Sequence, residues 1–408
     1  MVALESDPTR ENRDTTRMLA ILGAFFFVAA LIGYLATLSF GPAIPRDGTS
    51  LVVGRDFLNV WMYGRAALSA DPSRFYDLAA YHQALDALLG PGYPGQNWSY
   101  PPSIFFLAAP FGGLGYLPAL LAWTVLGAAV FIAVARAHVS DKRLLLALVL
   151  SPAAVLCLIS GQSSLVTAAM LVTIFAFLDR RPNAAGVLIG LLTLKPQLGI
   201  LFPVMLIASG RWRVFASAAV TTLALVAATA IVFGPQVWVD FATKGLAAQN
   251  LVLADPERIA TPFYPTVFMN LRGIDLPYAV AMVVQLCFSG FAIAAVAWAY
   301  RFRRDADPLL LMALFLACAI AAVPYLLSYD TLALTFAALL LLAADTLDAT
   351  GRRFVQLVYW LPLIQIGLGN LHVPGPALIA PAFALYALMR LRASPASTAF
   401  DARCITAR

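Results

Sequence analysis

The stretch MLAILGAFFFVAALIGYLATLSF, residues 18–40, contains no charged side chain. A membrane-spanning helix needs about 20 predominantly apolar residues, so this stretch is long enough to span. A polar leader with Arg10, Arg13 and Arg17 precedes it. The stretch is too long for the apolar core of a signal peptide and has no convincing small-residue cleavage site, so it predicts a retained signal anchor. The arginines place the N-terminus in the cytoplasm.

The composition extends this prediction to the whole chain. Of 408 residues, 61% are apolar and 12% are charged, whereas soluble domains carry about 25% charged residues. Apolar stretches recur from residue 18 to residue 389 with no polar interval long enough for a soluble domain. We therefore expect one all-α polytopic membrane domain over residues 1–408. The four cysteines are scattered, which excludes a disulfide framework or a CxxC metal site.

The apolar stretches predict twelve spans with both termini in the cytoplasm. They cover approximately residues 18–40, 117–136, 144–160, 163–178, 184–194, 197–209, 214–233, 277–300, 308–326, 331–345, 354–369 and 374–389. The fifth and sixth are short and could form a re-entrant hairpin, which leaves ten spans and the same sidedness. Residues 1–17 and 390–408 become a cytoplasmic leader and tail.

The basic residues support this topology, because cytoplasmic loops are enriched in Lys and Arg. The predicted inside segments hold 19 of the 27 basic residues and the outside holds 8. The net charge of +6 is therefore interpreted as a topology signal, with no nucleic acid partner. We expect a multi-pass membrane protein.

Two outer loops are long enough to have structure of their own, residues 41–116 and 234–276. Leu58–Ala70 and Leu78–Leu89 mix apolar and polar positions, which suits juxtamembrane helices lying along the membrane surface. An apolar segment, Ile104–Pro110, follows them.

Asp56 follows Gly54 and Arg55 just beyond the first span. A carboxylate beside the apolar Phe57 and Val60 could be partly desolvated and act as a general base. Alternatively, Asp56 could be the N-cap of the helix that follows, since Asp is a favoured cap.

Two further outer motifs have both structural and functional interpretations. Tyr100-Pro101-Pro102 closes the first loop, where proline at a helix start is ordinary. Gly161-Gln162 lies at the outer junction of two spans, as a tight turn or as an amide that donates to a polar ligand.

Lys195-Pro196-Gln197 interrupts the apolar run from Ala184 to Ala208. A charge near membrane depth costs several kcal/mol and is by default a functional candidate. Lys195 could pair with an anionic ligand such as a lipid phosphate, or it could snorkel to the interface.

The remaining outer candidates are Tyr325, Tyr329 and Asp330, with Arg258 and Arg272 in the second long loop. Tyr325 and Tyr329 are expected on one helical face at the end of the ninth span, from their i, i+4 spacing. The arginines could clamp a phosphate or simply be hydrated. All these candidates map to outer ends of the predicted spans, which one outward-facing cavity would explain.

The ordered set Arg55-Asp56-Phe57, Tyr100-Pro101-Pro102, Gly161-Gln162 and Leu194-Lys195-Pro196-Gln197 resembles glycosyltransferase family 87 over roughly residues 18–340. That family comprises bacterial membrane enzymes of the C-type superfamily, including polyprenyl-phosphate-mannose-dependent mannosyltransferases and arabinofuranosyltransferases. Relatives often have a histidine near the outer end of a late span, where this chain has Tyr325, Tyr329 and Asp330.

The resemblance implies an inverting transferase that moves a mannose-like hexose or an arabinofuranose from a polyprenyl-phosphate donor. The acceptor would be an envelope glycolipid or glycan on the outer face. It also implies that Asp56 is the catalytic base and that Tyr100, Gln162, Lys195 and Gln197 shape the donor site. Arg55, Arg258, Arg272, Tyr325, Tyr329 and Asp330 complete the predicted substrate-binding set. No cofactor and no metal are expected, because a monophosphate leaving group held by cations needs none.

Two other functions compete with this one. Twelve spans and a broken helix with a charge are also traits of a secondary transporter, although its polar groups should lie near the midplane. A non-catalytic component of envelope glycan assembly would tolerate loss of Asp56. The sugar, the acceptor and the oligomeric state are not predicted.

Overall fold

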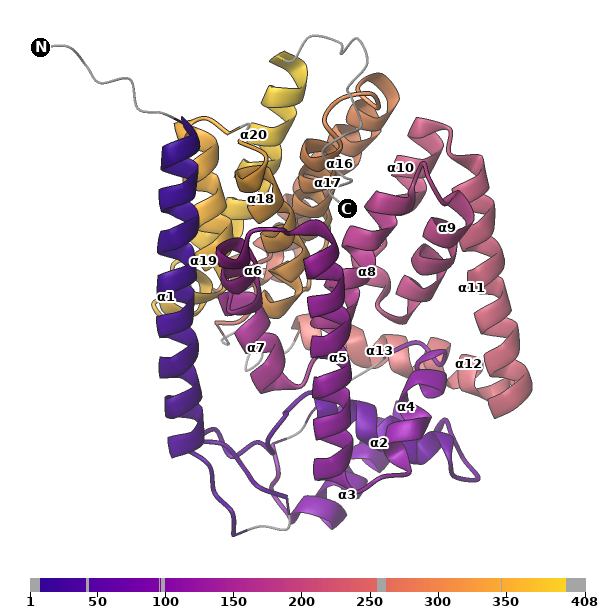
Figure 1. Cartoon of the computed structure of the whole chain (residues 1–408). Coiled ribbons are helices and arrows are strands. Elements are labelled where there is room, and N and C mark those ends of the chain that lie inside the picture. Colours follow the sequence, from indigo (N-terminus) through magenta and orange to yellow (C-terminus); the bar gives the residue numbers. More distant parts are fainter. Residues whose placement is uncertain are drawn as a thin grey trace, which may run out of the picture.

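The protein is a bundle of helices (Figure 1). The computed structural model describes residues 8–41, 44–94, 96, 100–254, 262–345 and 347–393. Within these residues there is no β-strand, only two isolated bridges that join Arg46 to Ser39 and to Val52. The predicted all-α membrane fold is confirmed.

Among the described residues, five apolar helices are long enough to cross a membrane. They lie in α1 (Pro8–Ala36), α5 (Tyr116–His138), α11 (Trp212–Phe233), α16 (Tyr278–Phe302) and the C-terminal segment of η6 (Gly375–Leu378) with α20 (Ile379–Ala393). A sixth span arises if α6 (Lys142–Val149) and α7 (Pro152–Ser160), bent by 44°, are counted together.

The other predicted spans are shorter or less apolar. Five apolar helical segments of 10–17 residues are Ser164–Phe177, Pro182–Leu194, Pro196–Ser209, Pro308–Ala322 and Ser328–Ala343. They contain α8 (Ser164–Phe177), α9 (Pro182–Leu191), α10 (Phe202–Ser209), α17 (Pro308–Ala322) and α18 (Leu332–Ala343). Helix α19 (Ala349–Asn370) covers the eleventh predicted span. At a rise of 1.5 Å per residue, α8 is about 21 Å long, less than the roughly 30 Å of a bilayer core.

Burial separates core helices from lipid-facing ones. Every residue of α17 from Leu310 to Ala322 is buried, and so is α18 from Leu332 to Leu342. In contrast α11 exposes side chains such as Ile231, which is 82% accessible. A helix that is apolar all round and buried belongs to a core, so α17 and α18 form the centre of the bundle.

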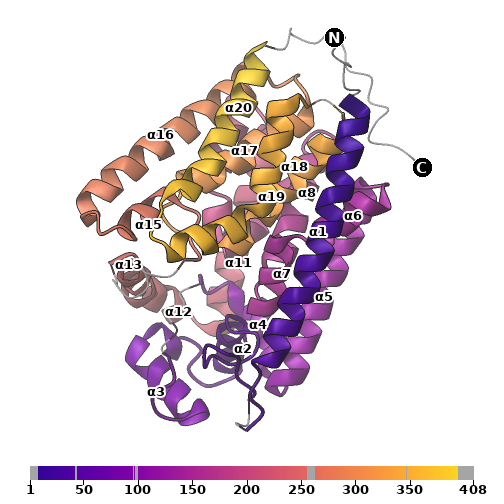
Figure 2. The same ribbon diagram turned by 90° about the vertical axis from the view of Figure 1, so that its left-hand side faces the viewer.

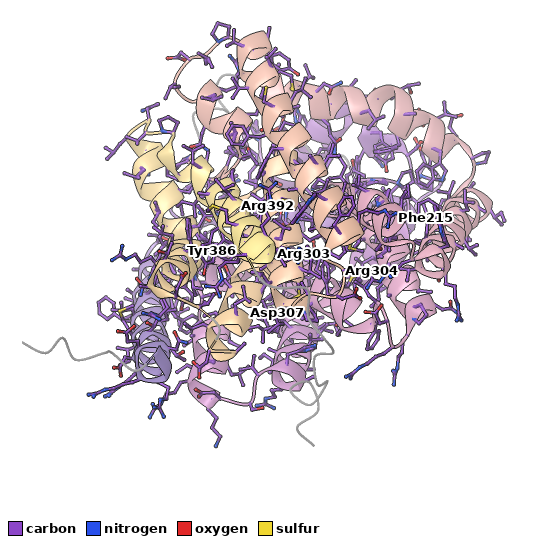
Figure 3. All side chains as sticks on the ribbon, turned by 90° about the horizontal axis from the view of Figure 1, so that it is seen from above. Phe215, Arg303, Arg304, Asp307, Tyr386 and Arg392 are labelled. Atoms are coloured by element: carbon purple, nitrogen blue, oxygen red, sulfur yellow. The ribbon has the colours of Figure 1, made fainter. Side chains whose placement is uncertain are left out.

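The first long loop contributes a second, aromatic-rich core at one end of the bundle, which we call the loop end. Helices α2 (Phe57–Ala67), α3 (Leu78–Leu89) and α4 (Ile104–Gly112) gather there with α12 (Gln236–Asp240) and α13 (Leu246–Ala254) (Figures 1 and 2). The opposite end carries Arg303, Arg304 and Arg392, and we call it the basic end (Figure 3).

Helix α2 differs from the expected surface helix. All of its residues except Arg65 are buried, and its Gly64 meets Gly112 of α4 backbone to backbone. Because neither glycine has a side chain, α4 can pack closely against α2. It covers the face of α2 that was expected to be exposed to water. Helix α3 is the more superficial of the two, with only Tyr81 and Leu85 buried.

The expectation that Tyr325 and Tyr329 share one face of a helix is wrong. Helix α17 ends at Ala322, and Val323 is extended at φ −104° and ψ 140°. Pro324 follows Val323 and disfavours the helical region for it. Tyr325 therefore lies in an extended linker, and Tyr329 lies in the short 3-10 helix η5 (Ser328–Thr331).

Candidate active site

Asp56 is carried by a turn that packs directly on the α7–α8 junction. Gly54 and Arg55 have φ values of 74° and 26°, so the chain reverses sharply before α2. The amide of Asp56 donates to the carbonyl of Ser160 over 2.9 Å. Gly161, at φ 62°, lies so close that a Cβ there would be 2.6 Å from the Gly54 oxygen. Only glycine fits both this conformation and this approach.

The carboxylate of Asp56 is held by two side chains distant in sequence. Its Oδ2 accepts a hydrogen bond from Gln162 Nε2 over 3.1 Å and another from the Tyr329 hydroxyl over 2.9 Å. Asp56 occupies the N-cap position of α2 but makes no side-chain cap bond, so the capping alternative is wrong. Among the described residues, no group donates to Oδ1, and the side chain is only partly buried. Oδ2 is therefore fixed by two hydrogen bonds, and Oδ1 is free to accept a proton.

The surroundings of Asp56 pull its pKa in opposite directions. Burial raises the pKa of the carboxyl, and the hydrogen bonds from Gln162 and Tyr329 lower it. The positive charges of Lys195 and Arg55 lower it further, but burial prevails and the pKa lies above its ordinary value. A carboxylate of raised pKa is a stronger base than a free aspartate.

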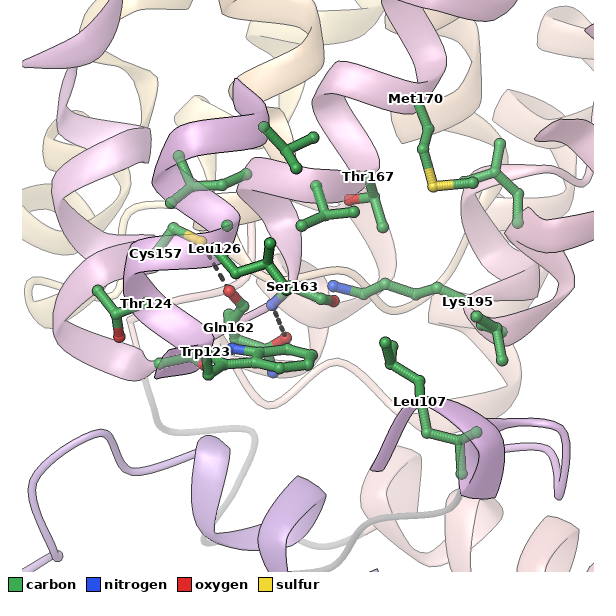
Figure 4. Close-up of a pocket in the computed structure, with 18 of the residues that line it drawn as sticks. Leu107, Trp123, Thr124, Leu126, Cys157, Gln162, Ser163, Thr167, Met170 and Lys195 are labelled. Atoms are coloured by element: carbon green, nitrogen blue, oxygen red, sulfur yellow. Dashed lines mark hydrogen bonds between the residues drawn. The ribbon is translucent and has the colours of Figure 1, made fainter. Parts of the chain in front are cut away.

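Gln162 has one fixed orientation (Figure 4). Its Oε1 accepts from the amide of Ser163 over 3.1 Å, which leaves Nε2 to donate to Asp56. The backbone around it is fixed as well, because its amide donates to the Cys157 carbonyl and Trp123 Nε1 donates to the Gly161 carbonyl. Gly161-Gln162 is therefore a tight turn, and its side-chain amide donates to Asp56, whereas donation to a polar ligand stays a prediction.

Lys195 lies at the break between α9 and α10 and is 3% exposed, so it does not snorkel to the interface. Its ammonium donates to Asp330 Oδ1 at 2.5 Å and lies 5.2 Å from the centre of the Tyr329 ring. The Ser164 hydroxyl donates to the same Asp330 oxygen over 2.6 Å. The sequence assigned Lys195 to an external anion, whereas here a carboxylate of the chain already pairs with it.

A cavity of about 180 Å³ lies beside these groups. Its walls are apolar side chains of α4, α5, α8 and α9, and its polar groups include Tyr100, Gln162 and Lys195. Figure 4 shows Lys195 reaching toward Ser163 across it. Leu126 both lines the cavity and is 54% exposed on α5, so the apolar wall continues to the lipid-facing surface.

The other predicted residues that the structure describes do not line the cavity. Arg55 pairs with Asp47 at 2.5 Å, and Arg272 donates to the Leu276 carbonyl over 2.8 Å. Tyr325 packs against Tyr264, with ring centres 5.2 Å apart.

Gln197 is partly buried in η3 (Pro196–Leu198) and does not line the cavity. Arg258 lies outside the described residues.

The sequence did not single out Ser164. Ser164 begins α8, and its partner Asp330 lies 166 positions away, so no local sequence pattern pointed to it. Within the described residues, no three His, Cys, Asp or Glu side chains form a group suited to a metal ion.

Comparison with known proteins identifies a family. The model of glycosyltransferase family 87 matches residues 98–328, more than half of the chain. This segment contains Tyr100, Gln162 and Lys195 and ends before Tyr329, while Asp56 lies ahead of it. No curated protein and no solved structure matches. The chain therefore belongs to glycosyltransferase family 87 and is a sugar-transferring enzyme built on membrane-length helices.

Proposed function

We propose that this protein transfers a mannose-like hexose or an arabinofuranose from a polyprenyl-phosphate donor to a glycolipid or glycan of the cell envelope. The observation that carries the proposal is that the carboxylate of Asp56 is hydrogen-bonded through only one of its two oxygens. Gln162 and Tyr329 fix one oxygen, and the free oxygen belongs to a partly exposed side chain.

In the proposed reaction, Oδ1 of Asp56 takes the proton of an acceptor hydroxyl as that oxygen attacks the anomeric carbon. The new carbon–oxygen bond forms on one face of the sugar while the bond to the phosphate oxygen breaks on the other. The bonding electrons leave with polyprenyl phosphate, and the anomeric configuration inverts. General base help of this kind contributes about 10²- to 10⁴-fold.

Lys195 is placed to stabilise the leaving phosphate. Asp330 accepts one of its three N–H groups, and the side chain lines the cavity with Tyr100 and Gln162. Preorganised donors aimed at developing charge are worth a few kcal/mol in a dry site. Because the lysine is already paired, it supplies oriented hydrogen bonds more than an unbalanced charge.

The cavity supports a lipid-linked donor. Its apolar walls continue to an exposed side chain on a membrane-length helix, which suits a prenyl chain and not a nucleotide. The excess of basic residues in the loops of the opposite end supports an outward-facing site in the inner membrane.

Transfer is tested with the purified full-length protein in vesicles, with a polyprenyl-phosphate mannose or arabinofuranose donor and a glycolipid acceptor. Asp56→Asn should lose 10²-fold or more of the activity. Asp86→Asn is the matched control, an exposed carboxylate of the same loop on α3, and should keep full activity. Full activity in Asp56→Asn would refute the role of Asp56 as the general base.

Orientation is tested by labelling single cysteines in an otherwise cysteine-free protein with a membrane-impermeant maleimide. Asp86→Cys at the loop end should react in intact cells. Arg304→Cys at the basic end should react only after permeabilisation. The reverse pattern would overturn the outward-facing site.

A further inference from the structure

The short helix η5 connects three distant parts of the chain at the site. Ser328 fixes its start by donating from its amide and hydroxyl to the Phe263 carbonyl, over 2.9 and 2.8 Å. Asp330 accepts from Ser164 and Lys195 on one side of the turn. Tyr329, the residue between these anchors, reaches Asp56 with its hydroxyl.

The anchors and the tyrosine are coupled through direct contacts. Lys195 donates to Asp330 and at the same time lies over the Tyr329 ring at 5.2 Å. A cation over the face of an aromatic ring is attracted to it, more strongly when desolvated. Asp330 is 7% exposed and Tyr329 is 6% exposed, so the contacts are shielded from water. A displacement of Asp330 therefore moves Lys195, the turn and the tyrosine together.

We propose that Asp330 and Ser164 are positioning residues: with Lys195 they fix the turn that carries Tyr329, and Tyr329 holds Oδ2 of Asp56 so that only Oδ1 is free to accept a proton. This assigns Tyr329 and Asp330 a role distinct from binding the donor. The inference rests on the proposed role of Asp56 as the base.

The hydrogen bond from Tyr329 also sets the acidity of Asp56. A donor to the charged form favours that form, so removing the hydroxyl raises the pKa of the carboxyl. A hydrogen bond to a charged group corresponds to a shift of about one pH unit or more. The other charged or titratable groups around Asp56 are Arg55, Tyr93, Tyr100, Tyr116 and Lys195, with Asp330 behind Lys195.

The test is an infrared titration of Asp56 in the detergent-solubilised full-length protein. The carbonyl band of its protonated form is assigned by its loss in Asp56→Asn. Tyr329→Phe should move the protonation midpoint upward by about one pH unit. Ser164→Ala, which alters no charge, should move it upward by less. In the Tyr329→Phe variant, Ser164→Ala should add nothing.

Asp330→Asn is a second variant for the same infrared titration of Asp56. Loss of its negative charge alone lowers the pKa of Asp56, and a loosened Tyr329 raises it. In the Tyr329→Phe variant only the charge effect remains, so the shift caused by Asp330→Asn should be more negative there than in the natural protein. Equal shifts in both proteins, or an unmoved midpoint in Tyr329→Phe or Ser164→Ala, would overturn the inference.

The acid limb of kcat/KM, measured in the vesicle assay, should follow the infrared midpoints. If the midpoints move as expected and no sugar is transferred, the proposed function fails and the positioning network stands. If sugar transfer depends on Asp56 but the midpoints do not move, only the network fails.

Discussion

Removing either partner of the buried Lys195–Asp330 pair should destabilise the protein far more than removing both. At 2.5 Å and an effective dielectric constant of about 20, the attraction between the two charges is about 6–7 kcal/mol. Desolvation of each ion costs several kcal/mol, so the net contribution of the pair is small. A single partner left behind keeps its desolvation cost without the attraction. Lys195→Met and Asp330→Leu should each lower the free energy of unfolding by about 3–5 kcal/mol.

The double variant Lys195→Met/Asp330→Leu should recover most of that loss. Equilibrium unfolding in mixed micelles measures all four proteins. The control is the ion pair between Arg211 and Asp179, in which the carboxylate side chain is 80% exposed. Asp179→Asn should change stability by about 1 kcal/mol or less.

The double variant also separates stability from catalysis. It should be folded and yet transfer little sugar, because it lacks the ammonium beside the cavity. A double variant no more stable than either single variant would refute the energetic reasoning. A double variant with full activity would remove Lys195 from the proposed mechanism.

Three further predictions concern the same regions. Gln162→Leu should shift the acid limb of kcat/KM to higher pH, because the lost hydrogen bond favoured the charged form of Asp56, and an unshifted limb would contradict that bond. Gly64→Ala should destabilise the protein, because its Cβ would meet the backbone of α4, whereas Gly33→Ala has open space and should not; thermal unfolding measures both. Gly127→Leu should fill the cavity and raise the KM for the lipid donor without moving the acid limb of the kcat/KM profile. An unchanged KM would show that the donor does not bind in the cavity.

The sequence predicted the helices better than their burial. Long apolar runs indicate spans because the bilayer demands them, and each predicted span falls on helical segments of the structure. Helix α2 was misjudged because its mixed pattern suited a surface helix. The contact between Gly64 and Gly112, which lets α4 cover it, depends on two glycines 48 positions apart (112 minus 64) that no local pattern connects.

The site was predictable as a set of residues but not as a network. Lys195 stood out because a charge that interrupts an apolar run is rare, and Asp56 and Gln162 stood out through their common outer side and the family resemblance. Their partners did not follow from spacing, since Asp330 lies 135 positions from Lys195 and Tyr329 lies 273 positions from Asp56. Pro324 broke the helix that would have placed Tyr325 beside Tyr329, so one tyrosine reaches the site and the other packs on Tyr264.

The separation between Lys195 and Asp330 also has a consequence for biogenesis. At about 5–20 residues per second of synthesis, the 135 residues between them take roughly 7–27 seconds to make. During that interval Lys195 lacks the carboxylate of Asp330, and an unpaired charge near membrane depth costs several kcal/mol. We therefore expect the broken pair α9 and α10 to remain at the insertion machinery or at the water interface until η5 is synthesised. The Lys195–Asp330 pair can therefore form only after about four fifths of the 408 residues have been synthesised.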